Sequence, residues 1–316
     1  MKIKYKVASR KSKLAIKQTE IVLHELTRLC GIDNFEITYI RTKGDVDKRL
    51  LFSMDRKGLF EMEVNNAVLN GEADFAVHSL KDIPTDFHKE LTIAAIPKRA
   101  SPRDVLIAMK KINLKDLQSG SKIGTSSLRR AIQILIVNRD INVVPIRGNI
   151  DTRIQKVFSG QYDAIVLAEA GLLRLGMNDV IVETFDAEDF CPAPGQGAMA
   201  VVCRKDNSRL LSLLKKIEHQ PSRISVDAER TLMTHIKAGC RFPVGALASC
   251  DTEKKTVRLR VKAFSADGKK TLMLEKIGAA NKAKAIGKEM ARSLIQNGIE
   301  GMADGWREAL NSWNNL

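Results

Sequence analysis

The chain has 316 residues, of which 44% are hydrophobic and 28% are charged, so we expect two or three domains with the composition of an ordinary soluble protein. No apolar run is long enough to span a bilayer, and the first residues alternate like a strand rather than forming a signal peptide. Five scattered cysteines lack metal-ligand spacing. They argue against a disulfide framework or a metal site and favour a cytoplasmic protein.

The net charge of +15 predicts an anionic partner, which can be nucleic acid, a membrane surface or a polycarboxylate or phosphate ligand. Aromatic residues make up only 5% of the chain, and no basic patch is interleaved with aromatics in the way that stacks single-stranded bases. The lysines of the last hundred residues fit exposed faces, so the clustered arginines are the informative part of the charge.

The first hundred residues alternate between short apolar strands and amphipathic helices. We expect strands at 4–8, 35–40, 73–77 and 91–96, and helices at 14–29 and 59–69. The first strand runs into Ser9-Arg10-Lys11-Ser12 directly before a helix. Hydroxyls, an arginine and the positive end of a helix dipole at one point favour an anion.

The strand at 73–77 leads into His78-Ser79-Leu80-Lys81-Asp82, and Pro84 prevents a regular helix from continuing there. Adjacent Lys and Asp residues at the end of a strand often form only a turn. Beside arginine-bearing segments, however, Asp82 is a candidate general acid/base or a carboxylate that stabilises a developing cation. We expect His78 to be structural.

The stretch from Lys122 to Arg153 repeats this pattern of strand, hydroxyls and helix. A strand at 122–124 precedes Thr125, Ser126 and Ser127, and a helix is expected at 128–137. A further strand at 141–146 follows. Each strand end carries two arginines, which we expect to reach one cleft: Arg129, Arg130, Arg147 and Arg153. Any one of them fits a solvated face, but four together favour a polyanion site.

The order of these segments predicts two similar α/β lobes joined by two crossings. Residues 97–102 lead into a second lobe with strands at 105–109, 122–124, 141–146 and 162–168. Residues 192–197 are loop by composition, and a strand at 198–203 returns to the first lobe. The expected lobes are 1–97 with 198–218, and 98–197, arranged as in periplasmic-binding-protein-like folds.

The remaining residues, 219–316, are expected to form a small α+β domain. It would contain a helix at 226–236, strands at 246–250, 257–264 and 271–277, a hairpin turn at Asp267-Gly268 and a closing helix at 282–296. Cys240 lies in a tight loop of this domain. Its pattern alone does not set it apart from the other four cysteines.

Eight runs, in order along nearly the whole chain, resemble the hydroxymethylbilane synthase (porphobilinogen deaminase) family. They are RKSKLAIKQ (10–18), KGLFEMEV (57–64), HSLKDIPT (78–85), IGTSSLRRAIQ (123–133), IRGNIDTR (146–153), DAIVLAEAGLLRLG (163–176), PAPGQGAMA (192–200) and AERTLMTHIKAGCRFPVGALA (228–248). One such run is unspecific, whereas eight in register are highly specific. The glycine pair that usually precedes KGLF is replaced by Asp55-Arg56.

The resemblance implies a transferase of porphyrin and heme biosynthesis. In this family a dipyrromethane cofactor is attached through a thioether to a cysteine, which here corresponds to Cys240. Four porphobilinogen units lose ammonia and are joined in turn, and the linear tetrapyrrole is then released by hydrolysis. Each pyrrole carries an acetate and a propionate, so the growing chain is a polycarboxylate.

The resemblance also implies roles for individual residues. Asp82 matches the catalytic carboxylate that stabilises the cationic azafulvene left when ammonia departs. The cofactor-binding residues would be Cys240, Lys81, Asp82, Thr125, Ser126, Ser127, Arg129, Arg130, Arg147 and Gly148. The substrate-binding residues would be Arg10, Ser12, Lys57, Arg147, Arg153, Arg174 and Gln196. Lys57 adjoins residues 47–56, which are expected to form a mobile loop, and neither a metal nor an obligate dimer is implied.

Two other functions remain open at this point. A two-lobed receptor or regulator for a small anion, without catalysis, explains the lobes and the arginines. It has no use for Asp82 among cations or for a third domain with a cysteine. A nucleic-acid-binding protein explains the charge, but it predicts a recognition motif that the sequence lacks.

Overall fold

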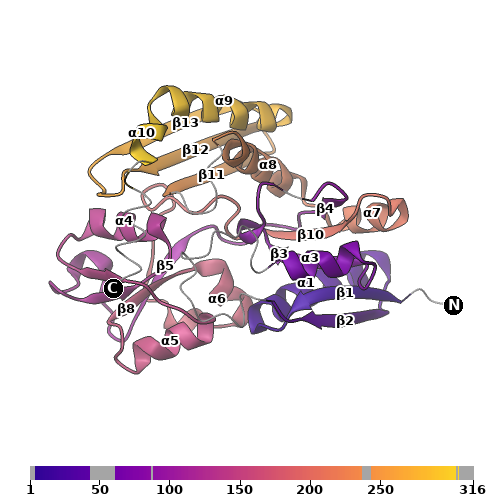
Figure 1. The fold of residues 1–316 in the computed structure, drawn as a ribbon, viewed down its shortest axis with the longest axis horizontal. Helices are drawn as coiled ribbons and strands as arrows, with labels where there is room; N and C mark the ends of the chain where they lie inside the picture. Colours follow the sequence, from indigo (N-terminus) through magenta and orange to yellow (C-terminus); the bar gives the residue numbers. More distant parts are fainter. Residues whose placement is uncertain (1–3, 43–60, 87, 237–242, 304, 306–316) are drawn as a thin grey trace.

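The computed structural model describes residues 4–42, 61–86, 88–236, 243–303 and 305. These residues form two five-stranded sheets and one three-stranded sheet, each covered by helices. In Figure 1 the two larger sheets lie side by side, and the third sheet with its helices lies above them. The expected mobile loop at 47–56, Lys57 and Cys240 lie outside the described residues.

The first sheet has the order β2-β1-β3-β10-β4. Strands β1 (Tyr5–Arg10), β2 (Phe35–Ile40) and β3 (Phe75–Ser79) are parallel, whereas β10 (Met199–Arg204) runs antiparallel to β3 and to β4 (Leu91–Ala95). Successive strand residues point to opposite faces, and both faces are buried. Helices α1 (Lys13–Cys30) and α7 (Ser208–Leu214) bury one face, and α3 (Met62–Leu69) buries the other.

The second sheet has the order β7-β6-β8-β5-β9. Its strands are β5 (Asp104–Ala108), β6 (Lys122–Gly124), β7 (Asn142–Val144), β8 (Ala164–Ala168) and β9 (Glu183–Thr184). Helices α4 (Leu128–Val137), α5 (Ile150–Phe158) and α6 (Glu169–Leu175) connect or follow these strands. We call the two sheets with their helices the first lobe and the second lobe.

Two connections join the lobes. The first crossing (96–103) links β4 to β5, and the second crossing (185–198) links β9 to β10, which inserts between β3 and β4 of the first sheet. The crossings touch each other, because the Gly197 carbonyl accepts a hydrogen bond of 3.1 Å from the Ala100 N–H. The predicted two-lobed α/β fold with two crossings is therefore confirmed.

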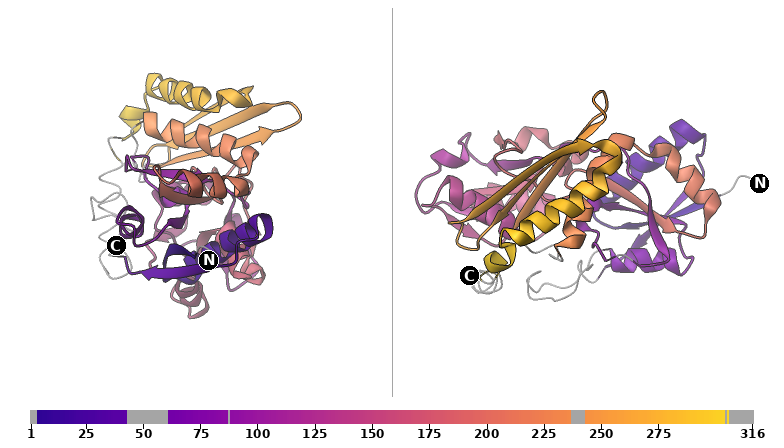
Figure 2. Two further views of the ribbon diagram at one scale, coloured as in Figure 1. Left: turned by 90° about the vertical axis from the view of Figure 1, so that its right-hand side faces the viewer. Right: turned by 90° about the horizontal axis from the view of Figure 1, so that it is seen from above.

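The C-terminal α+β domain is also confirmed. It contains α8 (Gln220–His235), an antiparallel meander of β11 (Val244–Asp251), β12 (Thr256–Phe264) and β13 (Thr271–Ala279), then α9 (Ala283–Gln296) and α10 (Ile299–Ala303). Figure 2 shows α9 lying over the C-terminal sheet, in about the same direction as its strands, when the molecule is seen from above. The two long helices pack against each other and against β11 and β13.

Several predicted boundaries were wrong, for identifiable reasons. Helix α8 begins six residues earlier than expected, because His219 caps it by accepting from the Ser222 N–H and proline is tolerated in a first turn. The strand expected at 141–146 shortens to β7, since Pro145 lacks an N–H for the ladder. Helices α5, α6 and α7 were not predicted, because each has at most nine residues and short amphipathic runs carry little periodicity.

A buried ion pair holds the C-terminal domain to both crossings. The Glu229 carboxylate on α8 has no exposed side-chain surface, and it accepts hydrogen bonds from Arg99 Nη1 (2.6 Å) and Nη2 (3.2 Å). It also accepts from the Gly195 N–H (2.6 Å) and the Ala248 N–H (2.7 Å). One carboxylate thus connects the first crossing, the second crossing and β11.

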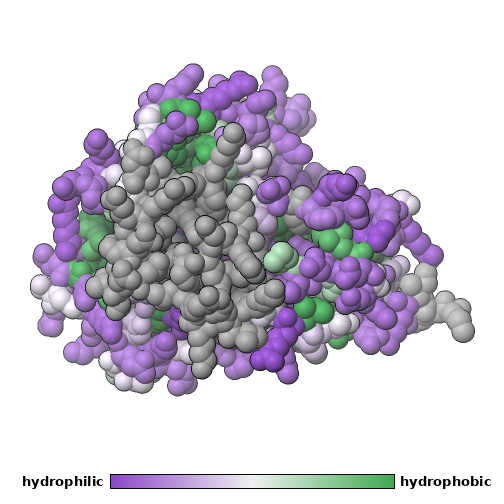
Figure 3. Space-filling model, viewed as in Figure 1, coloured by the Kyte–Doolittle hydropathy of each residue, from purple (hydrophilic) through white to green (hydrophobic). Residues whose placement is uncertain are grey.

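The surface agrees with the charged composition. In Figure 3 hydrophilic side chains cover most of the visible described surface, and the apolar patches between them are small. Among the helices that the structure describes, none is both long enough and apolar enough to cross a membrane.

The contact between the crossings predicts a severe effect of Gly197→Ala. Gly197 has φ +84°, and a Cβ there would lie 2.5 Å from the Ser101 carbonyl oxygen and 2.6 Å from that of Ala100. Left-handed strain together with a backbone clash should destabilise the protein by about 3 kcal/mol or more. The control is Gly160→Ala, which has φ +73° and no atom within 4 Å of the new Cβ, and which should cost only about 1–2 kcal/mol. Equal decreases in the free energy of unfolding for Gly197→Ala and Gly160→Ala, measured in urea, would contradict the predicted backbone clash.

Candidate functional site

A cleft of about 960 Å³, counting space open to solvent, lies between the two lobes. The first lobe contributes the end of β1, the start of α1 and the turn after β3, and the second lobe contributes α4, α5 and α6. Seven of the predicted site residues line it: Arg10, Ser12, Lys81, Arg130, Gly148, Arg153 and Arg174. The structure therefore brings residues from separate sequence runs to one place.

The hydroxyl groups before α1 and α4 serve the backbone. Ser12 caps α1 by accepting from the Ala15 N–H at 3.3 Å, and Ser127 caps α4 by accepting from the Arg130 N–H at 3.5 Å. Thr125 is fully buried and accepts from the Ser127 N–H at 3.2 Å. Ser126 exchanges hydrogen bonds with the backbone of Ile146. Of these four residues, Ser12 lines the cleft.

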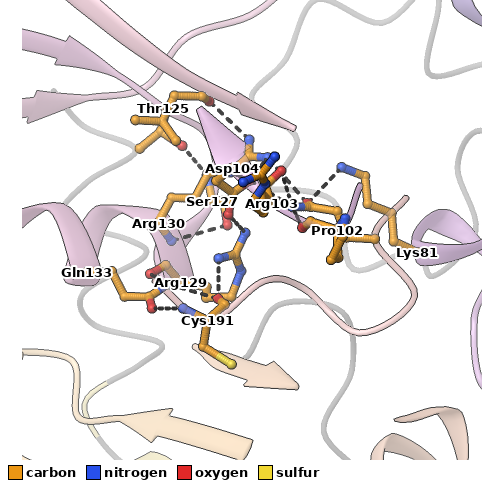
Figure 4. A network of polar contacts seen from close by, with 12 residues as sticks. Lys81, Pro102, Arg103, Asp104, Thr125, Ser127, Arg129, Arg130, Gln133 and Cys191 are labelled. Atoms are coloured by element: carbon orange, nitrogen blue, oxygen red, sulfur yellow. Dashed lines mark hydrogen bonds and ion pairs between the residues drawn. The ribbon is translucent and has the colours of Figure 1, made fainter. Parts of the chain in front are cut away.

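The two arginines in the first turn of α4 are paired with a carboxylate of the second lobe. Asp104, at the start of β5, receives Arg129 Nη2 on Oδ2 at 2.8 Å, and Arg130 Nε and Nη2 on Oδ1 at 3.0 and 2.7 Å (Figure 4). Arg129 also donates to the Cys191 carbonyl at 2.6 Å. Arg129 is 4% exposed and is not among the cleft-lining residues, whereas Arg130 reaches the cleft.

Asp104 is ionised because of these partners. Burial would raise its pKa, but the charges of Arg129 and Arg130 and the hydrogen bonds from Arg130 and Gln196 lower the pKa to about 2. Gln196, in the second crossing, donates from Nε2 to Asp104 at 2.8 Å and to the Pro102 carbonyl at 2.7 Å. A carboxylate thus fixes the arginine side chains of the second lobe against the crossings.

Gln196 also connects this cluster to the first lobe. Its Oε1 accepts from Lys81 Nζ at 3.3 Å and from Arg130 Nη2 at 3.5 Å. Burial, followed by the charge of Arg130, lowers the pKa of Lys81 to about 8, although Asp82 and Asp104 oppose this shift. The Lys81 ammonium is therefore held beside another cation, a state that an added carboxylate would relieve.

Asp82 follows Lys81 in a short 3-10 turn, Leu80–Asp82, directly after β3. It is exposed, and its carboxylate makes no hydrogen bond or ion pair within the described part of the chain. Its charge is nevertheless felt by Lys81 and by Arg153. The turn therefore presents a carboxylate that is available to a ligand and lies between cations of both lobes.

The other cleft arginines are oriented by backbone carbonyls. Arg153 Nε donates to Gly148 at 2.7 Å, and Arg174 Nη2 donates to Gly197 at 2.6 Å. Burial lowers the pKa of each to about 10, and Arg130 and Arg147 add to the effect at Arg153. Arg147 is half-buried and, like Asp82 and Gln196, is not among the cleft-lining residues.

His78 is structural, as expected. It is 7% exposed, and its Nε2 lies 3.0 Å from Asn65 Oδ1 on α3. Burial, together with the charge of Arg10, lowers its pKa to about 4, so it is neutral at pH 7.

Sequence interpretation missed three residues that shape the site: Asp104, Lys13 and Asp151. Lys13 and Asp151 line the cleft and form an ion pair across it, at 2.7 Å. A signal for Asp104 was present, because a charged residue opens a strand, DVLIA, that is otherwise apolar and fully buried. Charged residues are seldom buried unless they are paired.

Asp104→Asn should leave two buried guanidinium groups without their counter-charge and destabilise the protein by about 3–5 kcal/mol in urea unfolding at pH 7. Because the folded-state pKa is depressed to about 2, the stabilisation is present above pH 4 and is lost as the pH falls through 2. The difference in the free energy of unfolding between the wild type and Asp104→Asn should therefore become smaller as the pH falls towards 2. Asp206→Asn, in the exposed pair with Arg204, is the control and should leave the urea midpoint almost unchanged, because solvent screens an exposed ion pair. A loss of stability at Asp206 as large as that at Asp104 would contradict this.

Comparison with known proteins places the chain in a family. Residues 5–212 match the family model "Porphobilinogen deaminase, dipyromethane cofactor binding domain", and residues 224–296 match "Porphobilinogen deaminase, C-terminal domain". The chain is 46% identical over 312 residues to a probable porphobilinogen deaminase of Nitrosopumilus maritimus, covering 99% of both chains. It is 41% identical to the porphobilinogen deaminase of Brevibacillus brevis, covering 93% of this chain and 95% of the relative.

A solved structure, the methionine-binding protein MetQ, is similar with a TM-score of 0.44 and 12% identity, covering 67% of this chain and 89% of MetQ. The sequence matches are far closer than this, and they extend over the lobes and the C-terminal domain alike. The chain therefore belongs to the porphobilinogen deaminase family.

Proposed function

We propose that this protein is a hydroxymethylbilane synthase, a transferase that removes ammonia from porphobilinogen and joins four units into the linear tetrapyrrole hydroxymethylbilane. The observation that carries the proposal is the cation-lined cleft between the lobes, with the exposed Asp82 directly following the lining residue Lys81 in the turn after β3. Each substrate unit brings two carboxylates, so a chain of pyrroles needs several cations in one place. The family to which the chain belongs performs this reaction.

The residues present fit a dipyrromethane cofactor. Its acetate and propionate groups require cations, and the lining supplies them from both lobes: Arg10, Lys81, Arg130, Arg153 and Arg174. We propose a thioether to Cys240 and a cofactor-binding site formed, by direct contact or by positioning its neighbours, by Lys81, Asp82, Thr125, Ser126, Ser127, Arg129, Arg130, Arg147 and Gly148. When bound, the cofactor supplies the free pyrrole end from which the chain is built.

The hydroxyl side chains before α4 contribute indirectly in this scheme. Because Thr125, Ser126 and Ser127 already bind backbone groups, we propose that they fix the start of α4 and hence Arg130. Arg129 likewise acts through Asp104, with which it pairs. Arg130 and Lys81 are the cations of this set that line the cleft.

Asp82 is the proposed catalytic residue. A carboxylate without partners among the described residues, beside Lys81 and Arg153, is free to accept hydrogen bonds from pyrrole N–H groups and to take or return a proton. Its negative charge would stabilise the cation that forms as ammonia leaves porphobilinogen. We propose Arg10, Ser12, Lys57, Arg147, Arg153, Arg174 and Gln196 as substrate-binding residues.

The domain division follows from the sheets. We propose lobes at 1–97 with 198–218 and at 98–197, and a cofactor-carrying domain at 219–316. We also propose that the protein is a cytoplasmic monomer. We propose that it binds neither nucleic acid nor membranes, because its arginines gather around a cleft. An anion receptor without catalysis is less well supported, since it gives Asp82 no role.

The attachment site is tested by intact mass. Protein with a covalent dipyrromethane should be heavier than its sequence predicts by two pyrrole units, and it should give colour with an acidic aldehyde reagent. Cys240→Ser should have the mass of its sequence alone, while Cys250→Ser, a change at another described free cysteine, should retain the adduct. An unmodified native protein that also gains no mass with porphobilinogen would overturn the proposal.

The depressed pKa of Lys81 predicts a pH dependence. Since that pKa is about 8, the ammonium that binds substrate carboxylates is lost above pH 8, and kcat/KM should fall there. In Lys81→Arg the guanidinium remains charged, so the fall should move to higher pH even if the maximum is lower. If kcat/KM falls at the same alkaline pH in the wild type and in Lys81→Arg, the fall is due to another group.

A further inference from the structure

Among the described residues that line the cleft, one carboxylate is surrounded by cations. Six of the described lining residues are cationic: Arg10, Lys13, Lys81, Arg130, Arg153 and Arg174. Asp151 is the only acidic residue among those described lining positions. The Asp151 carboxylate competes with the carboxylates of any ligand for the same cations. The cation that pairs with Asp151 is therefore the place where a ligand carboxylate would compete.

Asp151 pairs with Lys13 from the opposite lobe. Lys13 is the first residue of α1 and Asp151 is the second residue of α5, and Nζ lies 2.7 Å from Oδ2. The Lys13 side chain is 78% exposed and that of Asp151 is 33% exposed, so the pair is accessible to solvent and to a ligand in the cleft. The hydrogen bond from Lys13 lowers the pKa of Asp151, so the carboxylate is ionised at pH 7.

The helix dipole stabilises the charge of one partner and opposes the charge of the other. Asp151 lies in the first turn of α5, where the positive end of the helix dipole stabilises a carboxylate. Lys13 lies in the first turn of α1, which contains no acidic residue, so its charge is opposed by its own helix. Lys13 therefore gains more from an anion than Asp151 gains from a cation.

We propose that Lys13 is a further binding residue for the side-chain carboxylates of the substrate or growing chain, and that Asp151 occupies it until such a carboxylate takes its place. The inference rests on the proposed function. One carboxylate replaces another at the Lys13 ammonium, and Asp151 keeps the stabilisation of its own helix. Because an exposed ion pair is weak, the exchange needs little free energy, and substrate binding would open the contact between α1 and α5.

The proposal makes the two halves of the ion pair act in opposite directions. Lys13→Gln should raise KM for porphobilinogen about two- to five-fold, and Asp151→Asn should lower KM by a similar factor, with kcat unchanged in both. The double variant should match Lys13→Gln, because Asp151 acts only through Lys13. The effect of Lys13→Gln should shrink as salt rises.

Lys17→Gln is the matched control, because Lys17 pairs with Glu20 on the same helix at 3.3 Å and does not line the cleft. Its KM should equal that of the wild type. Shifts in the same direction for Lys13→Gln and Asp151→Asn, or a lower KM on adding Asp151→Asn to Lys13→Gln, would overturn the proposal. A change in KM for Lys13→Gln that is no larger than the change for Lys17→Gln would also overturn the proposal.

A binding measurement separates this proposal from the proposed function. The dissociation constant for porphobilinogen is measured by calorimetry in the Cys240→Ser background, where no chain can be built. Lys13→Gln should weaken and Asp151→Asn should strengthen binding by the same two- to five-fold. If the native protein converts no porphobilinogen while these opposite shifts persist, the proposed function fails and the carboxylate site stands. Normal turnover without the shifts would overturn the carboxylate site and leave the proposed function intact.

Discussion

The arrangement of the three parts depends on one buried carboxylate. Glu229 satisfies its oxygens with the Arg99 guanidinium of the first crossing and the Gly195 N–H of the second. It also binds the Ala248 N–H of β11. Removing a partner from a buried charge is costly, so these segments keep their relative places. The two elements that flank Cys240 in the sequence, α8 and β11, are therefore both held to the crossings.

A second buried carboxylate, Asp104, sorts the arginines into two groups. Arg129 and Arg130 are neutralised and fixed by Asp104, whereas Arg153 and Arg174 are held by backbone carbonyls that carry no net charge. Burial, and after it the charge of Arg130, lowers the pKa of both Lys81 and Arg153. Carboxylates of a bound oligopyrrole would relieve the repulsion among these cations, so affinity for a polyanion is built into the cleft.

Much of the fold was accessible from the sequence because its signals are local. Ser127 followed by apolar residues at helical spacing defined α4 to the residue, and proline-rich segments located both crossings. Pairing between distant residues was not accessible: nothing local shows that Asp104 meets two arginines 25 and 26 positions later, or that Lys13 meets Asp151. The same limit explains why Arg129 was expected in the cleft. Its position on α4 was right, but the direction of its side chain depends on a partner in another strand.

The interior position of β10, between β3 and β4 of the first sheet, has a consequence for synthesis on the ribosome. Strand β4 pairs with β10 in this sheet, and β10 ends only at Arg204. All strands of the second sheet lie between 104 and 184 and can associate earlier. At translation rates of about 5–20 residues per second, the edges of β3 and β4 that pair with β10 remain without that partner for on the order of ten seconds. The part of the chain made first is therefore the last of the two lobes to close.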